Sequence, residues 1–214
     1  MLRNTPKRII VAITGASGAA YALRFLECAA AHYDEVYVML SDQARQVIAL
    51  ETGLNLPPGN AAQVQLPGNS HCTMRLLDRK DYFSPPASGS FVHDGMVIVP
   101  CSMGTAGRIA NGISDDLVTR AADVCLKERR KLILVPREMP WNLIQLRNMT
   151  ALTEAGATIL PASPGFYNRP KTIEDIVDHV VARILQQLGV SHHLSPEWAV
   201  ADEESEVDME PNSL

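Results

Sequence analysis

The stretch from Arg8 to Ala31 constrains the fold more than any other part of the chain. It begins with an apolar run over residues 8–13 that is rich in β-branched side chains, which is typical of a strand buried on both faces. Two glycines follow at once in the turn Gly15–Gly18, and apolar residues then recur at helical spacing from Leu23. The pattern predicts a buried strand, a tight glycine turn and a helix.

Such a turn is suited to binding a phosphate group. The first N–H groups of a helix have no partner within the helix, and the helix dipole adds partial positive charge at the same place. Glycine also lets a ligand approach the backbone closely. We therefore predict a phosphate site at Gly15–Gly18, and the alternative is a strand-to-helix connection that binds nothing.

Composition limits the class of protein. The chain has 214 residues, of which 46% are hydrophobic, as expected for one packed domain. It contains no apolar run of about 18 residues, so we expect no membrane span. The four cysteines are scattered without a CxxC pair, which predicts reduced thiols, a cytoplasmic setting and no zinc ribbon: Cys28, Cys72, Cys101 and Cys125.

The net charge of −5 is concentrated at one end. Residues 201–214 carry six acidic residues and no Lys or Arg, and the remainder has 19 basic against 18 acidic residues. We expect residues 1–190 to form a single α/β domain, and residues 191–214 to be an extension with a disordered acidic end. No basic block suggests a nucleic-acid partner.

Further strands and helices are expected to alternate along the chain. The strand candidates after the first are Glu35–Leu40, Met96–Val99, Leu132–Val135 and Thr158–Leu160. Helices are expected after Ser41, after Ser102, after a cap at Ser114, with Pro140 in a first turn, and after Thr172. The stretch from His71 to Phe83 is ambiguous, and Gly53–Ser70 is a Gly- and Pro-rich break.

This alternation predicts a three-layer α/β fold, Rossmann-like or flavodoxin-like, with a mostly parallel sheet. In such sheets ligands bind beyond the carboxyl ends of the strands. Polar and small residues follow several of these ends, including Ser41, Cys101–Thr105 and Arg137. The turn has GxxG rather than the fuller GxGxxG, so a dinucleotide is weakly supported and a mononucleotide is favoured.

Several motifs in order resemble the UbiX-type flavin prenyltransferases, over nearly all of residues 7–188. They are Thr14–Arg24, Ser88–Phe91, Gly95–Thr105, Asp115–Pro140, Leu146–Met149 and Pro161–Pro170. The resemblance implies an enzyme that transfers a dimethylallyl group from dimethylallyl phosphate to N5 and C6 of reduced FMN, without a metal. It also implies a homo-oligomer, commonly a dodecamer with sites between subunits, and a UbiD-type decarboxylase that receives the prenylated FMN.

The same resemblance assigns the site residues. FMN contacts are carried over to Gly15, Ala16, Ser17, Ser41, Ser102, Met103, Gly104, Thr105 and Arg137. The prenyl phosphate and its chain are assigned to Ser90, Lys127, Tyr167, Arg183 and Trp198. Catalytic roles fall on Glu138, Ser17 and Lys127, with Glu138 in proton transfer near the flavin.

These residue types suit that chemistry. Ionising an allylic phosphate requires fixed donors around the leaving anion, and Lys127, Arg183 and Tyr167 offer two cations and a hydroxyl. The allylic cation needs a dry, π-rich enclosure, which the flavin and Trp198 can form. A proton must then leave flavin C6, to Glu138 or to the released phosphate.

Ordinary structural roles stay open beside this interpretation. Each serine at a strand end can simply cap a helix, Lys127 can be a solvated helix end, and Arg183 a surface side chain. Two other functions also stay open: a flavin-dependent cysteine decarboxylase and a carrier that only delivers FMN. Against the first, the chain has Ser88-Gly89-Ser90 where the catalytic His of that group would fall.

Overall fold

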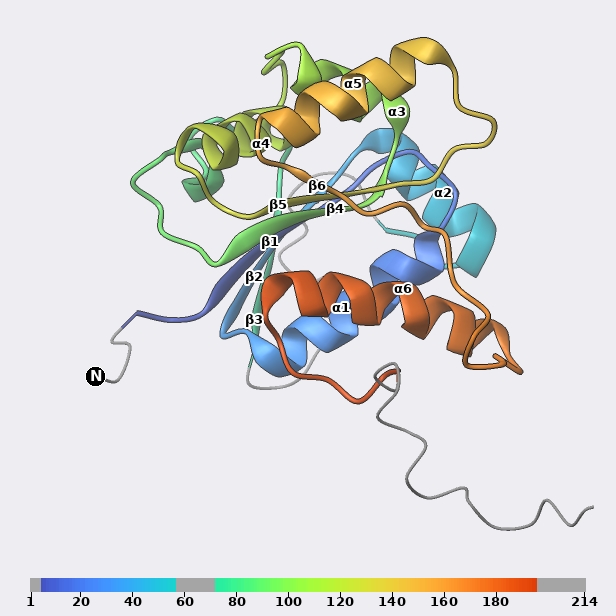
Figure 1. Cartoon of the computed structure of the whole chain (residues 1–214). Helices are drawn as coiled ribbons and strands as arrows, with labels where there is room; N and C mark the ends of the chain where they lie inside the picture. Colours follow the sequence, from blue (N-terminus) through green and yellow to red (C-terminus); the bar gives the residue numbers. More distant parts are fainter. Residues whose placement is uncertain (1–4, 57–71, 196–214) are drawn as a thin grey trace, which may run out of the picture.

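The computed structural model describes residues 5–56 and 72–195, which form one α/β unit around a six-stranded, all-parallel sheet (Figure 1). The strands are β1 Arg8–Ile13, β2 Glu35–Leu40, β3 Thr73–Leu77, β4 Gly95–Cys101, β5 Leu132–Pro136 and β6 Thr158–Ile159. The helices are α1 Ala19–His32, α2 Asp42–Thr52, the short 3₁₀ turn η1 Pro85–Ala87, α3 Met103–Ala110, α4 Leu117–Lys127, α5 Leu143–Glu154 and α6 Ile173–Leu188.

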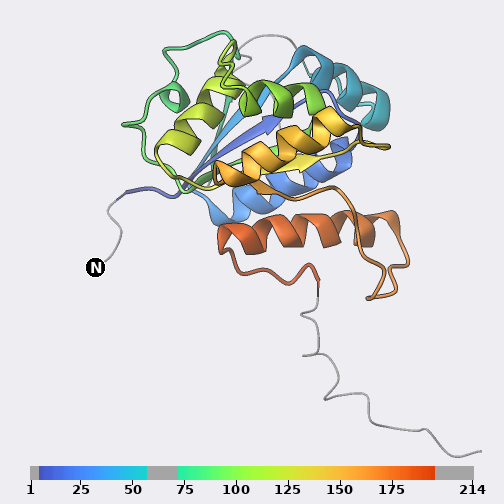
Figure 2. The same ribbon diagram turned by 45° about the horizontal axis from the view of Figure 1, so that its top comes forward.

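The strand order is β3-β2-β1-β4-β5-β6. Strands β2 and β3 are added on one side of β1, and β4, β5 and β6 are then added on its other side. Helices α1 and α6 cover one face of the sheet, and α3, α4 and α5 cover the other (Figures 1 and 2). This confirms the predicted three-layer fold. The reversal between β1 and β4 creates a switch point, where ligands bind in open parallel sheets.

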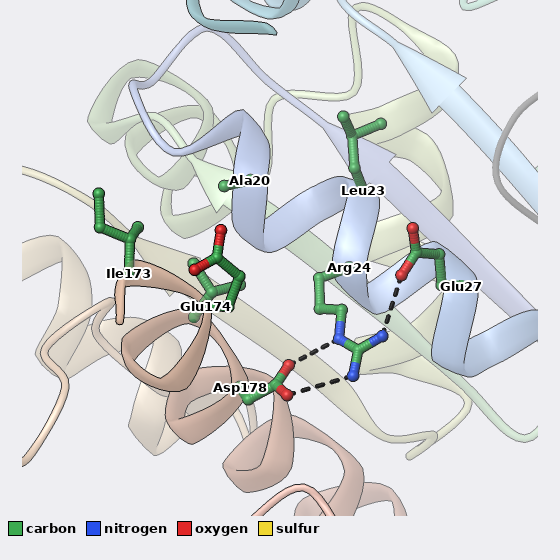
Figure 3. Close-up of a pocket in the computed structure, with 8 residues that line it drawn as sticks. Ala20, Leu23, Arg24, Glu27, Ile173, Glu174 and Asp178 are labelled. Atoms are coloured by element: carbon green, nitrogen blue, oxygen red, sulfur yellow. Dashed lines mark hydrogen bonds and ion pairs between the residues drawn. The ribbon is translucent and has the colours of Figure 1, made fainter. Parts of the chain in front are cut away.

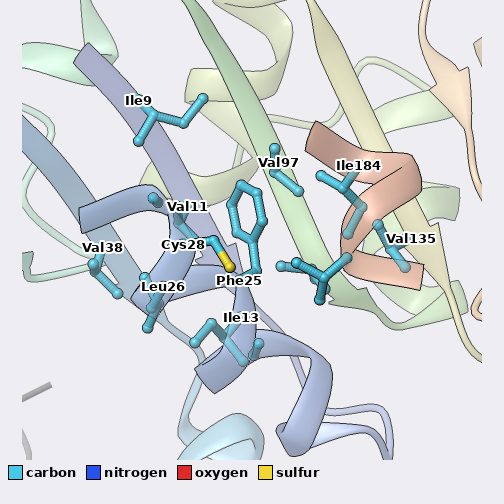
Figure 4. Close-up of a cluster of buried hydrophobic side chains, with 14 of the residues drawn as sticks. Ile9, Val11, Ile13, Phe25, Leu26, Cys28, Val38, Val97, Val135 and Ile184 are labelled. Carbon is cyan, nitrogen blue, oxygen red and sulfur yellow. The ribbon is translucent and has the colours of Figure 1, made fainter. Parts of the chain in front are cut away.

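The core is packed on both faces of the sheet, as the apolar strand sequences predict. Phe25 of α1 is fully buried against Val11, Val97 and Ile184 (Figure 4). Burying one side chain of this size contributes about 2–3 kcal/mol. The central strands β1 and β4 are thereby held in a fixed register, Ile9–Ala12 against Gly95–Ile98.

Several expected boundaries are confirmed. The Ser41 hydroxyl caps α2 by accepting the Ala44 N–H at 3.0 Å, and Thr172 with Asp175 forms the capping box of α6. The apolar stripe of α6 is buried from Val177 onward, whereas Ile176 is half-buried and Ile173, in the first turn, is 74% exposed. The ambiguous stretch contains strand β3, and residues 57–71 lie outside the described part.

Three boundary predictions are wrong. Ser114 does not cap α4: the capping box is formed by Asp116 and Thr119, so the helix starts later. Pro140 lies outside α5, which Asn142 caps together with Gln145. Pro100 does not end β4, since the strand shifts register between Ile98 and Cys101 and so accommodates a residue without an N–H.

Gly18 is the N-cap of α1 and has φ +122°, a conformation that L side chains rarely adopt. An added Cβ would also lie 2.9 Å from Cδ2 of Tyr21. We expect Gly18→Ala to lower the free energy of unfolding by about 1–3 kcal/mol. Chemical denaturation measures this, with Gly104→Ala as a control, because a Cβ at Gly104 would meet nothing within 4 Å. Equal stability of the two variants would refute the expectation.

His93 is a second position with a measurable consequence for stability. Its ring is 8% exposed, Nδ1 lies 3.1 Å from the Gly95 carbonyl oxygen and Nε2 lies 3.9 Å from the Cys125 Sγ. Burial lowers the pKa of His93 to about 4, and the positive charge of Arg130 adds to this, whereas the Gly95 carbonyl and Asp94 oppose it.

His93 is therefore neutral in the folded chain, and the unfolded chain binds the extra proton between pH 6.5 and 4. Stability is complete above pH 6.5 and falls as the pH falls towards 4. Between pH 6.5 and 4, we expect the free energy of unfolding of wild type to fall by up to about 3 kcal/mol more than that of His93→Gln. Denaturant titrations at several pH values measure it, and parallel pH profiles would contradict it.

Candidate functional site

The loops after β1 and β4 are tied together at the switch point. The Thr14 hydroxyl donates to the Pro100 carbonyl at 2.9 Å and accepts the Ser102 N–H at 2.7 Å. The turn Gly15–Gly18 and the segment Ser102–Thr105 therefore lie beside each other, although they are far apart in the sequence. This bridge through Thr14, which is almost fully buried, was not predicted from the sequence.

The serines at the strand ends are helix caps, as their ordinary structural role predicts. Ser41 caps α2, and the Ser102 Oγ accepts the Thr105 N–H at 3.4 Å and lies 3.0 Å from the Thr105 Oγ1. A hydroxyl that accepts a bond can still donate its hydrogen. Capping and ligand binding are thus compatible at Ser41 and Ser102.

Glu51, near the end of α2, is a residue that the sequence analysis missed. Its carboxylate accepts the N–H groups of Gly18 at 3.0 Å and of Ala19 at 2.7 Å. Glu51 therefore hydrogen-bonds the N–H groups at the start of α1 that were predicted to bind a phosphate. A sequence signal was hard to see, because Glu51 is 32 residues from Ala19 and no local pattern links them.

The charge of Glu51 is stabilised in place. Desolvation by itself would raise the pKa of this carboxyl, but the Ser17 hydroxyl, the Ala19 and Gly18 N–H groups and the positive charge of Arg137 lower it below its usual value overall. Glu51, Ser17 and Arg137 thus form one polar cluster over the end of β1. A fixed negative charge at the start of α1 disfavours a second anion there.

Arg137 and Glu138 extend this cluster from the end of β5. The Arg137 Nε donates to the Ser17 carbonyl at 3.2 Å, and the Glu138 Oε1 accepts the Met139 N–H at 3.1 Å. Both side chains are exposed. They are free to meet a ligand that lies across the carboxyl ends of β1, β4 and β5.

Lys127 and Ser90 lie together, but at the opposite edge of the sheet. Lys127 ends α4 shortly before β5 begins, and Ser90 comes shortly before β4 begins. Both therefore lie near the amino ends of the strands, whereas Arg137 lies at the carboxyl end of β5. A Cβ on Gly89 would lie 2.8 Å from the Lys127 Nζ, which brings the two segments into contact. Lys127 also pairs with Glu128. The structure therefore joins these two predicted phosphate residues and separates them from Arg137.

The remaining predicted residues are dispersed in a single chain. Tyr167 is 77% exposed in the loop after β6, on the carboxyl side of the sheet. Arg183 is exposed on α6, where its Nη1 donates to the Gln186 Oε1 at 2.6 Å. Trp198 lies outside the described residues. One chain thus presents a polar cluster with Ser17, Glu51 and Arg137 at the carboxyl edge of the sheet and Lys127 with Ser90 at the other edge.

A cavity of about 460 Å³ lies between α1 and α6, away from these residues (Figure 3). Arg24 on α1 donates to both carboxylate oxygens of Asp178 on α6, at 2.6 and 3.1 Å, and also pairs with Glu27. These bonds hold the two helices together beside the cavity. None of the predicted site residues lines it.

Within residues 5–56 and 72–195, no group of three or more His, Cys, Asp or Glu side chains is arranged to hold a metal ion. No helix in these same residues is long and apolar enough to cross a membrane.

A parallel α/β sheet with a polar cluster at its switch point is the architecture of a nucleotide-binding protein. The family model described as Flavoprotein matches residues 2–185. The chain therefore belongs to the Flavoprotein family.

Its similarity to particular members is substantial. It is 47% identical over 197 residues to the flavin prenyltransferase UbiX of Pseudomonas aeruginosa, covering 90% of this chain and 94% of that one. A structure of AnUbiX (PadA1) in complex with FMN and dimethylallyl pyrophosphate is 38% identical, with a TM-score of 0.82, over 91% and 98% of the two chains. A dodecameric FMN-dependent UbiX-like decarboxylase from Escherichia coli O157:H7 is 42% identical, with a TM-score of 0.80, over 89% and 98%.

Proposed function

We propose that this chain is a flavin prenyltransferase that transfers a dimethylallyl group from dimethylallyl phosphate to N5 and C6 of reduced FMN. The observation that carries the proposal is the 47% identity to UbiX of Pseudomonas aeruginosa over 90% of this chain. The family model, which matches residues 2–185, spans every predicted site residue except Trp198. Prenylated FMN serves a UbiD-type decarboxylase in the cytoplasm, and the scattered free cysteines suit that compartment.

FMN is the acceptor substrate and binds across the carboxyl ends of β1, β4 and β5. The residues that would hold it are Gly15, Ala16, Ser17, Ser41, Ser102, Met103, Gly104, Thr105 and Arg137. Glu51 already accepts the first N–H groups of α1. The phosphate group of FMN therefore binds at the start of α3, which has no acidic residue in its first turn. Ser17 and Arg137 are then left beside the flavin ring.

The prenyl phosphate is held by Ser90, Lys127, Tyr167 and Arg183. Because one chain separates Ser90 and Lys127 from Arg137, the complete site requires a second copy that brings its Lys127 edge to the first copy's flavin edge. Exposed apolar side chains follow Glu138 along the chain and suit coverage by such a copy: Met139, Leu143 and Ile144. The dodecameric relative supports a homo-oligomer of this kind.

The reaction needs charge stabilisation and one proton acceptor. Lys127, Arg183 and Tyr167 stabilise the phosphate as the allylic C–O bond breaks and a bond to flavin N5 forms. The prenyl double bond then takes up the proton that N5 has lost, and its dimethyl-bearing carbon bonds to flavin C6. The proton on C6 leaves to Glu138 or to the released phosphate. The exposed Glu138 carboxylate lies next to Arg137 at the end of β5, on the flavin side of the site.

The two alternatives are less well supported. A cysteine decarboxylase would need its His where this chain has Ser88-Gly89-Ser90. The two relatives that are 47% and 48% identical over about nine tenths of the chain are named flavin prenyltransferases. A carrier would have no use for Lys127, Arg183 or Glu138.

The test is an anaerobic incubation with reduced FMN and dimethylallyl phosphate, followed by mass spectrometry of the released flavin. We expect the flavin to gain one C5H8 unit, and a parallel reaction with the diphosphate distinguishes the two donors. An unchanged flavin mass with both donors would refute the proposal and leave the carrier and the decarboxylase.

A further inference from the structure

Arg130 holds the segment that contains Ser90 by both arms of its guanidinium group. Its Nη1 donates to the Phe91 carbonyl at 2.7 Å, and its Nη2 donates to the Gly89 carbonyl at 2.5 Å. These two carbonyls flank Ser90 on either side. The side chain of Arg130 is therefore a two-point clamp on the backbone at Ser90.

The clamped segment is ordered around the Ser90 side chain. The Ser90 Oγ lies 2.8 Å from the Ser88 Oγ, and the Ser90 N–H donates to the Ser88 Oγ at 3.3 Å. The Phe91 N–H also donates to the Ser88 carbonyl at 3.2 Å. These contacts make a compact turn, with the Ser90 hydroxyl on its exposed side.

The same clamp sets the distance between this turn and Lys127. Arg130 follows α4 closely, so it and Lys127 leave the same helix end. Gly89 packs so tightly against this end that a Cβ would lie 2.8 Å from the Lys127 Nζ. Ser90 and Lys127 come from distant parts of the sequence, and Arg130 bonds one segment to the other at two points.

We propose that Arg130 is a positioning residue for the phosphate of the prenyl donor, acting through Ser90 and Lys127. The inference rests on the proposed function, because it uses the donor-binding role of those two residues. A planar guanidinium donates along two fixed directions at once, and a lysine ammonium cannot reproduce that fork. Misplacing binding groups by about 1 Å costs on the order of 10²-fold in reactivity.

The test compares Arg130→Lys, which keeps the charge, with Arg130→Gln, which removes it. Arg129→Gln is the matched control, since Arg129 is the exposed neighbour and forms no side-chain hydrogen bond or ion pair with the described residues. For each variant we would measure KM for dimethylallyl phosphate, kcat, the FMN dissociation constant and the melting temperature. Lys127→Ala is measured in parallel.

We expect both Arg130 variants to raise KM for dimethylallyl phosphate by about tenfold or more, with FMN affinity within about twofold of wild type. If Arg130→Gln does not fold, Arg130→Lys assayed below its melting temperature decides the question. A wild-type KM in Arg130→Lys would overturn the inference, because charge without the fork would then suffice.

Lys127→Ala separates this inference from the function on which it rests. A wild-type kcat/KM in Lys127→Ala means that the donor does not bind at this edge, and both the site assignment and the clamp fail. A lowered kcat/KM in Lys127→Ala with a wild-type KM in both Arg130 variants overturns the clamp alone and leaves the donor site standing.

Discussion

Glu138→Gln is expected to lower kcat for flavin prenylation by about 10²- to 10⁴-fold, the usual loss when a general acid or base is removed. The amide keeps the size of the side chain but cannot accept the proton from flavin C6. FMN binding is expected to persist, because the predicted FMN contacts come from the neighbouring Arg137 and from other strand ends. Single-turnover formation of prenylated FMN, followed by absorbance and mass spectrometry, measures the loss.

Glu154→Gln provides the control for this variant, since Glu154 is an exposed glutamate at the end of α5. It should turn over like wild type. If Glu138→Gln and Glu154→Gln both prenylate FMN at the wild-type rate, Glu138 has no role in proton transfer and the released phosphate takes the proton instead.

Lys127→Ala is the second large effect, with an expected loss of about 10²- to 10³-fold in kcat/KM for dimethylallyl phosphate, as for removal of one donor from a developing anion. The ammonium group would stabilise the phosphate as it leaves. Steady-state kinetics with varied donor measure the loss, and Lys80→Ala, which removes an exposed lysine after β3, is expected to behave as wild type. A wild-type kcat/KM in Lys127→Ala would place the donor elsewhere.

The position of Lys127 also allows a complementation test. Lys127 and Glu138 lie at opposite edges of the sheet in one chain, so a working site combines them from two copies. In mixed oligomers of Lys127→Ala and Glu138→Gln, about a quarter of such shared sites contain both intact residues. Co-expression should therefore restore part of the activity. No recovery in oligomers shown to be mixed would mean that the two residues act within one chain.

Much of the fold could be predicted from local patterns. The β-branched run before Gly15 and the Glu35–Leu40 run became β1 and β2, because strands buried on both faces of a parallel sheet require continuous apolar sequence. The capping box of Thr172 and Asp175 marked the start of α6 correctly. One error arose where neighbouring polar residues could each cap a helix: Asp116 rather than Ser114 caps α4. Another arose because a register shift lets β4 continue through Pro100.

The site was less accessible to sequence reasoning. Residues at the carboxyl ends of strands could be grouped, since all parallel strands end at the same edge. Glu51 could not be found, because its partners Gly18 and Ala19 are brought to it only by the packing of α2 beside α1. The resemblance placed Lys127 and Arg137 in one site, but only the fold shows that they lie at opposite edges of a chain.

The sequence by itself determined the alternation of strands and helices, the glycine turn after the first strand and the family to which the chain belongs. These depend on local residue patterns, because residue type and spacing favour burial, a turn or a helix start without any distant contact. The tertiary structure alone decided that Glu51 bonds the first N–H groups of α1, that Arg130 clamps the backbone around Ser90, and that the two halves of the site are separated. Such contacts join residues that are distant in the chain, so only the packing of the elements determines them.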